Sequence, residues 1–171
     1  LPELARFKNH FHHLRVLHAA GMVSLEGEWA FNKDWNSVPW MSADVFYRVK
    51  GDCVVFASQT KAIVIDYKSG KRFGNEIKHT EQMQLYALSV FLKYPKIKEV
   101  TVELWYLDLG ELHKMRYTRE QGLRLLPNFN KRGLELVTCE TFPPNPNKFS
   151  CKWCPYKPVE LGGTGHCPDG V

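Results

Sequence analysis

A short apolar run that ends in charged residues constrains the fold of this chain more than any other feature. Residues 62–65, with the sequence AIVI, form a continuous apolar segment, which is the pattern of a buried strand. Asp66-Tyr67-Lys68 follows at once, and Ser69-Gly70-Lys71 then turns the chain. Side chains two residues apart on a strand share a face, so Asp66 and Lys68 point the same way. A carboxylate beside an ammonium group suits metal-assisted phosphate chemistry, and it suits a plain salt bridge equally.

A second acid lies close by in the sequence. Asp52 precedes Asp66 by 14 residues, at the start of an expected strand 53–57 that a turn connects to the 63–68 strand. If these two strands are antiparallel neighbours, both carboxylates converge near one edge of the sheet. Mg²⁺ and similar hard ions prefer such oxygen ligands. A metal there would activate water and offset charge on a phosphodiester, while Lys68 would orient the water or stabilise negative charge.

The rest of the pattern predicts a mixed α/β domain. Residues 1–137 are expected to form the core, and the Pro-, Asn-, Gly- and Cys-rich residues 138–171 to form a tail packed on it. The expected helices and strands of the core are listed in chain order. They are a helix 2–20, a strand 23–31, a loop 32–43, strands 43–50 and 53–57 separated at Gly51-Asp52, the 63–68 strand, a helix 76–94, a strand 100–108, a strand 112–117 after a Leu109-Gly110 turn, and a helix 118–133.

The 76–94 helix carries polar side chains that could face the acids. Gln82 and Tyr86 are four residues apart and share a helix face, and His79 lies on roughly the same face. An amide and a phenol beside an acid pair can position a phosphate or a base. A polar helix surface is the alternative interpretation.

Asp52, the apolar strand into Asp66-Tyr67-Lys68, and Gln82-x-x-x-Tyr86 together resemble the RecB-like branch of the PD-(D/E)XK nuclease superfamily, over roughly residues 40–95. The resemblance implies a restriction-endonuclease-like core, a mixed central β-sheet flanked by helices. It implies that Asp52, Asp66 and the Tyr67 carbonyl hold Mg²⁺ or Mn²⁺, and that Lys68, Gln82 and Tyr86 complete the catalytic site. The implied activity is exonuclease-like hydrolysis of DNA ends or single strands in recombination, repair or phage DNA processing.

The cysteines predict a second metal site. Four of the five lie near the C-terminus, and Cys151 and Cys154 form a CxxC. Some RecB-like nucleases hold an iron–sulfur cluster with one upstream and three C-terminal cysteines. By this resemblance Cys151, Cys154 and Cys167 would be the three C-terminal ligands, but no cysteine precedes residue 53. Either Cys139 completes a four-thiolate site for Zn²⁺ or a [4Fe-4S] cluster, or the fourth ligand lies in a segment upstream of Leu1. Cys53 is expected to point into the core, because it adjoins Asp52 on a strand.

Other candidates surround the predicted site. Lys71, Arg72 and Lys78 could contact DNA phosphates or belong to a solvated turn, and Glu26 and Glu28 lie where related nucleases often carry a strand glutamate. The histidines of the first helix lack the context of the metal-binding histidine of RecB-like enzymes. That motif, or a partner protein that supplies the missing part, is therefore expected to lie outside a chain that begins at Leu1.

Composition adds bounds to these hypotheses. The formal charge of +5 mildly favours an anionic partner, and no apolar run is as long as a membrane-spanning segment. The resemblance implies the cytoplasm of a bacterial or phage-infected cell. Two alternatives remain open: an inactive nuclease-like module that binds DNA or a partner, with a structural zinc or iron–sulfur site, and a structural zinc protein whose Asp66–Lys68 pair is a surface ion pair.

Overall fold

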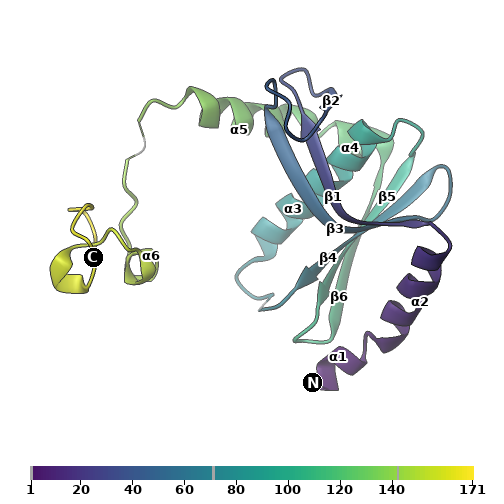
Figure 1. The fold of residues 1–171 in the computed structure, drawn as a ribbon, viewed down its shortest axis with the longest axis horizontal. Coiled ribbons are helices and arrows are strands. Elements are labelled where there is room, and N and C mark those ends of the chain that lie inside the picture. The colour runs from purple at the N-terminus through teal and green to yellow at the C-terminus, as the bar shows by residue number, and fades with distance from the viewer. Residues whose placement is uncertain (1, 71, 142) are drawn as a thin grey trace. The chain divides into compact units, whose positions relative to one another are not determined.

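The computed structural model describes residues 2–70, 72–141 and 143–171, and it divides the chain into two compact units between Leu134 and Glu135. The first unit is built on a six-stranded sheet with the order β2-β1-β3-β4-β5-β6 (Figure 1). Its strands are β1 Val23–Phe31, β2 Ser37–Val38, β3 Tyr47–Phe56, β4 Lys61–Lys68, β5 Glu99–Tyr106 and β6 Glu111–Thr118. Its helices are α1 Pro2–Ala5, α2 Lys8–Ala19, α3 Glu76–Lys93 and α4 Arg119–Leu123, and α5 Leu126–Thr138 crosses the division. The expected mixed sheet with flanking helices is confirmed.

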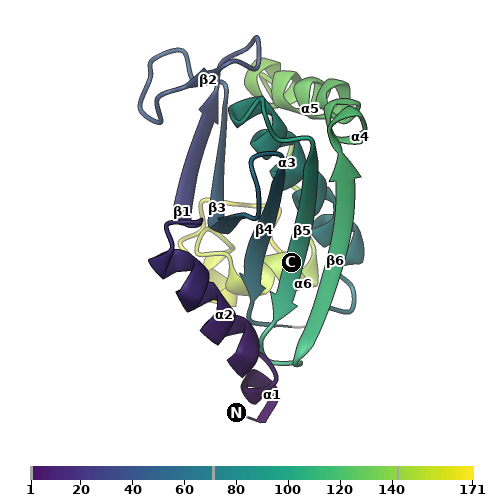
Figure 2. The ribbon, with the colours of Figure 1, turned by 90° about the vertical axis from the view of Figure 1, so that its right-hand side faces the viewer.

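The sheet is mixed because one connection is a helical crossover. β3 pairs antiparallel with β4, as expected for the 53–57 and 63–68 strands, β1 pairs antiparallel with β3, and β5 and β6 form a hairpin whose loop contains Gly110 at φ +65°. β4 and β5 instead pair in parallel, and α3 makes the long connection that parallel strands need. Figures 1 and 2 show α2 and α3 on opposite faces of the sheet.

Each face of the sheet is sealed by its own apolar cluster. On the α3 side the cluster includes Val64, Val102 and Met83 of α3, each fully buried. On the α2 side, Phe7 packs with Cys53, Ile65 and Trp105, and the Phe7 and Trp105 rings stack 5.1 Å apart. Successive residues of β4 therefore face different helices, so the apolar run 62–65 reads as a strand buried on both sides.

The expected break at Gly51-Asp52 is wrong, because β3 runs unbroken from Tyr47 to Phe56. Gly51 pairs with Gly27 of β1, and the Trp29 indole lies against both glycines. A Cβ on either residue would come within 3.2 Å of that ring. The buried Trp29 ring therefore packs directly on Gly51. This close packing explains the glycine, which does not interrupt the strand.

Two expected helices are each divided. The first is interrupted at Arg6 and Phe7, where the main-chain bonds span three residues and the Phe7 ring is buried against Trp105. The 118–133 helix is divided into α4 and α5 because Pro127 has no N–H to extend α4, whereas proline suits the first turn of a new helix. The expected 32–43 loop contains the short strand β2.

The second unit contains little regular structure. Helix α6 Lys148–Trp153 begins at Asn147, whose side chain accepts a hydrogen bond from the Ser150 N–H at 2.9 Å, and a 3₁₀ turn covers Val159–Leu161. Within residues 2–70, 72–141 and 143–171, none of the helices has the length and hydropathy that crossing a bilayer requires.

Candidate active site

The register of β3 against β4 places the two acids opposite each other. The last ladder pair is Cys53 with Ile65, so Asp52 and Asp66 occupy the next position on each strand. There the side chain of Asp52 replaces main-chain pairing, and its Oδ2 accepts a hydrogen bond of 2.9 Å from the Tyr67 N–H. Both predicted acids thus lie at one end of the β3–β4 pair.

The carboxylate of Asp66 is buried, with a residue exposure of 4%. Its Oδ1 accepts hydrogen bonds from the Tyr86 hydroxyl at 2.7 Å and from Gln82 Nε2 at 3.1 Å. Lys68 Nζ lies 2.7 Å from the other oxygen, Oδ2, as an ion pair. A buried carboxylate requires such partners, because leaving a charge unpaired away from water is costly.

Gln82 links the lysine to the tyrosine. Its Oε1 accepts from Lys68 Nζ at 2.7 Å, while its Nε2 donates to Tyr86 Oη at 2.8 Å as well as to Asp66. The amide therefore places its oxygen toward the cation and its nitrogen toward the anion. The structure brings together the four predicted side chains Asp66, Lys68, Gln82 and Tyr86.

Burial and the neighbouring charge fix the protonation state of Tyr86. Burial first, and then the carboxylate of Asp66, raise the pKa of the Tyr86 phenol well above its ordinary value. The hydroxyl consequently stays protonated and remains a hydrogen-bond donor to Asp66 across the physiological range.

Sequence reasoning assigned no site role to His79 or Tyr106, although both lie beside this network. His79 Nδ1 and Tyr106 Oη are 2.6 Å apart, and Tyr106 is the parallel-strand neighbour of Lys68. Burial, followed by the positive charge of Lys68, lowers the pKa of His79. The sequence signal for His79 was its helical spacing from Gln82. Tyr106 could be located only with the β4–β5 register.

The donor set at this end of the sheet fits a hard divalent cation. Lys68 approaches Asp66 Oδ2 without hydrogen-bond geometry, and among the described residues this buried oxygen has no hydrogen-bond donor. The Asp52 carboxylate bonds to the adjacent main chain at Tyr67. Carboxylate oxygens are the ligands that Mg²⁺ and Mn²⁺ prefer, and within the described part of the chain Asp66 Oδ2 is held by the Lys68 ion pair but by no hydrogen bond.

The flanking candidates lie at the surface. Arg72 is exposed and pairs with Glu111 at 3.6 Å, and Lys78 is exposed, whereas Lys71 lies outside the described residues. Glu26 is exposed and pairs with Lys50 at 3.2 Å, and Glu28 is also exposed. Glu26 adopts φ +49°, a left-handed conformation that is unusual inside a strand. These residues keep their predicted roles as hypotheses.

The cysteines of the second unit are free thiols in different surroundings. Cys139 is exposed, Cys151 is buried, and Cys154 and Cys167 are half-buried. Throughout residues 2–70, 72–141 and 143–171, no three His, Cys, Asp or Glu side chains gather as a metal-binding group. The cluster or zinc site at the cysteines and the Mg²⁺ or Mn²⁺ site at Asp52 and Asp66 therefore both stay predictions. Cys53, in contrast, is buried on the α2 face as expected, and burial raises the pKa of its thiol to about 11.

Comparison with known proteins gives one family and a distant structural likeness. No curated protein matches the chain closely enough to count as a relative. A solved structure described as "Crystal structure of SSO0001" is 17% identical over 95% of this chain and 68% of that chain, with a TM-score of 0.41, which is too low to carry an argument. The model of the PD-(D/E)XK nuclease superfamily matches residues 8–159, which include every residue of the network around Asp66. The chain belongs to the PD-(D/E)XK nuclease superfamily.

Proposed function

We propose that this chain is a divalent-metal-dependent DNA nuclease of the RecB-like branch, acting as an exonuclease on DNA ends or single strands. The observation that carries the proposal is the buried Asp66 carboxylate. Its Oδ1 has two donors, while its Oδ2 is paired with Lys68 and, among the described residues, has no hydrogen-bond donor. We infer that a divalent cation would take the place of the Lys68 ammonium group at this oxygen.

The residues divide the work of phosphodiester hydrolysis. Asp52, Asp66 and the Tyr67 carbonyl would hold Mg²⁺ or Mn²⁺, which supplies Lewis-acid stabilisation of the phosphate and acidifies water. Gln82 and Tyr86 fix the carboxylate of Asp66 through the bonds of 3.1 and 2.7 Å to its Oδ1. This support keeps the ligand in one orientation before substrate arrives.

Lys68 supplies the positive charge beside these groups. Its ammonium group is held between Asp66 Oδ2 and Gln82 Oε1, at 2.7 Å from each. With a divalent cation bound at Asp66, the Lys68 ammonium group would orient the attacking water or neutralise the phosphate. Gln82 remains as its hydrogen-bond partner and keeps it close to the reacting phosphate.

The proposal is tested by incubating the chain with end-labelled linear DNA and Mn²⁺, beside the variants Asp66→Ala, Lys68→Ala and Asp34→Ala. We expect metal-dependent loss of label that falls by about a thousandfold or more in Asp66→Ala and Lys68→Ala, because both remove stabilisation of the transition state. Asp34→Ala removes an exposed acid from the segment between β1 and β2 and should match the parent.

Closed circular DNA of the same sequence supplies the second control. An end-dependent enzyme degrades the linear form and leaves the circle intact. Equal cleavage by the parent and Asp66→Ala would rule out this mechanism. Metal-independent DNA binding with no cleavage under any condition would favour the inactive module.

A further inference from the structure

A pocket of about 490 Å³ lies at the end of the sheet opposite Asp66. β4 runs from Lys61 to Lys68, and this pocket adjoins its start, between the β3–β4 turn and the C-terminal end of α3. The proposed cleavage site lies at the other end of the same strand. The volume falls within the range of small-molecule sites, so the pocket is large enough to hold a ligand of its own.

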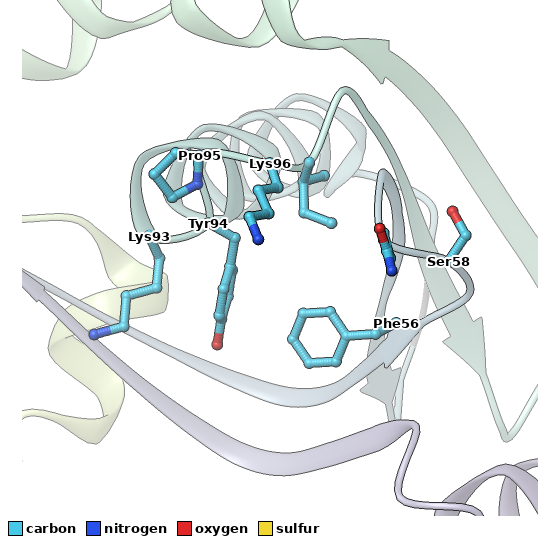
Figure 3. A pocket seen from close by; sticks show the side chains of 8 residues that line it. Phe56, Ser58, Lys93, Tyr94, Pro95 and Lys96 are labelled. Carbon is cyan, nitrogen blue, oxygen red and sulfur yellow. The ribbon is translucent and has the colours of Figure 1, made fainter.

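Aromatic side chains form part of the pocket wall. The Phe56 and Tyr94 rings meet edge to face with centroids 5.1 Å apart, and both residues are half-buried, so their rings remain accessible (Figure 3). Ile97 extends this apolar surface. Accessible aromatic rings bind flat aromatic groups such as nucleobases through stacking, with little dependence on the base.

The charged residues of the pocket are all cationic. Its eight lining residues include Lys93 and Lys96 and no acid. Lys93 Nζ donates to Ser37 Oγ at 2.9 Å, whereas Lys96 is exposed beside the two rings (Figure 3). The acid that follows in the sequence, Glu99, is already engaged by Arg116 and lies 3.4 Å from Lys61. An anionic group is the charge complement of this rim.

The C-terminal end of a helix such as α3 would ordinarily disfavour an anion, because its terminal carbonyls carry partial negative charge. Here Arg119 Nη1 donates to the carbonyl oxygens of Phe91 at 2.9 Å and Ile97 at 3.1 Å. The guanidinium group thereby offsets the negative end of α3 and fixes the loop that carries Tyr94 and Lys96. The pocket is consequently compatible with a phosphate.

We propose that this pocket binds one nucleotide unit, with its base on the Phe56 and Tyr94 rings and its phosphate at Lys96. An apolar aromatic wall beside a cationic rim matches the two halves of a nucleotide. A free nucleotide and a unit of a DNA strand present the same chemistry. Binding here is separate from hydrolysis at Asp66 and requires no divalent metal.

The test is a titration followed by amide ¹H–¹⁵N NMR and calorimetry, in EDTA so that no cleavage occurs. The probes are AMP, adenosine, inorganic phosphate and the dinucleotide pApA. Lys96→Glu reverses a charge on the rim, and Lys98→Glu makes the same charge change at an exposed residue outside the pocket lining. Both substitutions are at the surface, so the fold should be retained.

We expect AMP to shift the amide signals of residues 56–59, 93, 94, 96 and 97, and to bind at least about tenfold more tightly than adenosine or phosphate, because only AMP offers both contacts. Lys96→Glu should weaken AMP binding by about tenfold, and Lys98→Glu by less than about twofold. Tighter binding of pApA than of AMP assigns the pocket to a strand, and weaker binding assigns it to a free nucleotide.

Three results overturn the proposal: no saturable binding, equal effects of the two substitutions, or signal shifts confined to residues 66–86. None of them bears on the cleavage experiment, which depends on Asp66 and added Mn²⁺. Failure of the pocket and failure of the nuclease are therefore distinguishable.

Discussion

The sheet end that carries Asp66 and the cysteine-rich unit after Leu134 both contain side chains suited to metals, but they hold them differently. Asp66 is placed by two strands and a helix that share a large apolar core, and each neighbour of its carboxylate is fixed by another bond. In the second unit, Cys151 is the only buried residue among those described. A core can preorganise a metal site before the metal arrives, whereas a unit without one depends on the metal for its order.

The largest effect is expected at Asp52, in the unit whose apolar core holds Asp66 in place. Asp52→Asn keeps an oxygen that can accept from the Tyr67 N–H but loses the charge of a metal ligand. Mn²⁺-dependent cleavage should fall by about a thousandfold, with unfolding unchanged within about 1 kcal/mol. Rates from the end-label assay and thermal unfolding curves would measure both. The matched control is Asp34→Asn, which makes the same change at an exposed acid between β1 and β2 and should change cleavage less than about twofold. An Asp52→Asn enzyme that keeps a tenth or more of the parent rate would contradict the assignment.

Thiol reactivity compares the two regions directly. Burial raises the pKa of Cys53 from 9.0 to about 11, so at pH 8 its thiolate fraction is lower by about a hundredfold. Iodoacetamide should label Cys139 much faster than Cys53, because Cys139 is exposed and Cys53 is buried, as mass spectrometry of timed samples would show.

Cys53 should make the free energy of unfolding fall as pH rises above about 9. Below pH 9.0 the Cys53 thiol is protonated in both the folded and the unfolded chain, and it contributes nothing to the pH dependence of stability. Between pH 9.0 and about 11 the unfolded chain releases the proton first, so the free energy of unfolding falls as pH rises. Cys53→Ala should reduce that fall. Rapid labelling of Cys53 at pH 8 under native conditions would show that the α2 face opens.

A smaller effect is expected when one donor to Asp66 is removed. Tyr86→Phe leaves Gln82 as the donor to Oδ1, so stability should drop by about 1–2 kcal/mol and cleavage by about tenfold. Urea unfolding and the cleavage assay measure the two effects. Tyr117→Phe is the matched control, because that buried hydroxyl contacts the Met115 sulfur at 3.5 Å and should matter by less than about 0.5 kcal/mol. Equal losses in both variants would show that the Asp66 contact has no special value.

The smallest effect concerns the second unit. Cys154→Ser should abolish any zinc or iron bound at the predicted cysteine site, yet change the unfolding free energy of the sheet unit by less than about 0.5 kcal/mol. Elemental analysis and denaturant unfolding measure the two quantities, with Cys53→Ala as the variant that should keep its metal. Metal content unchanged by Cys154→Ser would remove that residue from the proposed ligand set.

The sequence located the hydrogen-bonded network around Asp66 because short-range spacing relates its members. Asp66 and Lys68 are related by strand alternation, and Gln82 and Tyr86 by helical periodicity, so short-range rules locate each pair. The position of Tyr106 escaped these rules because it depends on a parallel pairing of distant strands. The break predicted at Gly51 failed for a similar reason, since the ring that covers this glycine comes from Trp29 on the neighbouring strand. Tertiary contacts of this kind are invisible to periodicity.

The hydrogen bond from the Tyr67 N–H to Asp52 Oδ2 ties the proposed activity to the pairing of β3 with β4. A slip of β4 by one residue against β3 would turn Asp66 toward α2 and separate the two carboxylates. Compact chains with such a slip would keep their secondary structure and still lack the paired carboxylates that the proposed metal site requires. The specific activity of a preparation would then measure the fraction of molecules in the correct strand register, a quantity that circular dichroism does not detect.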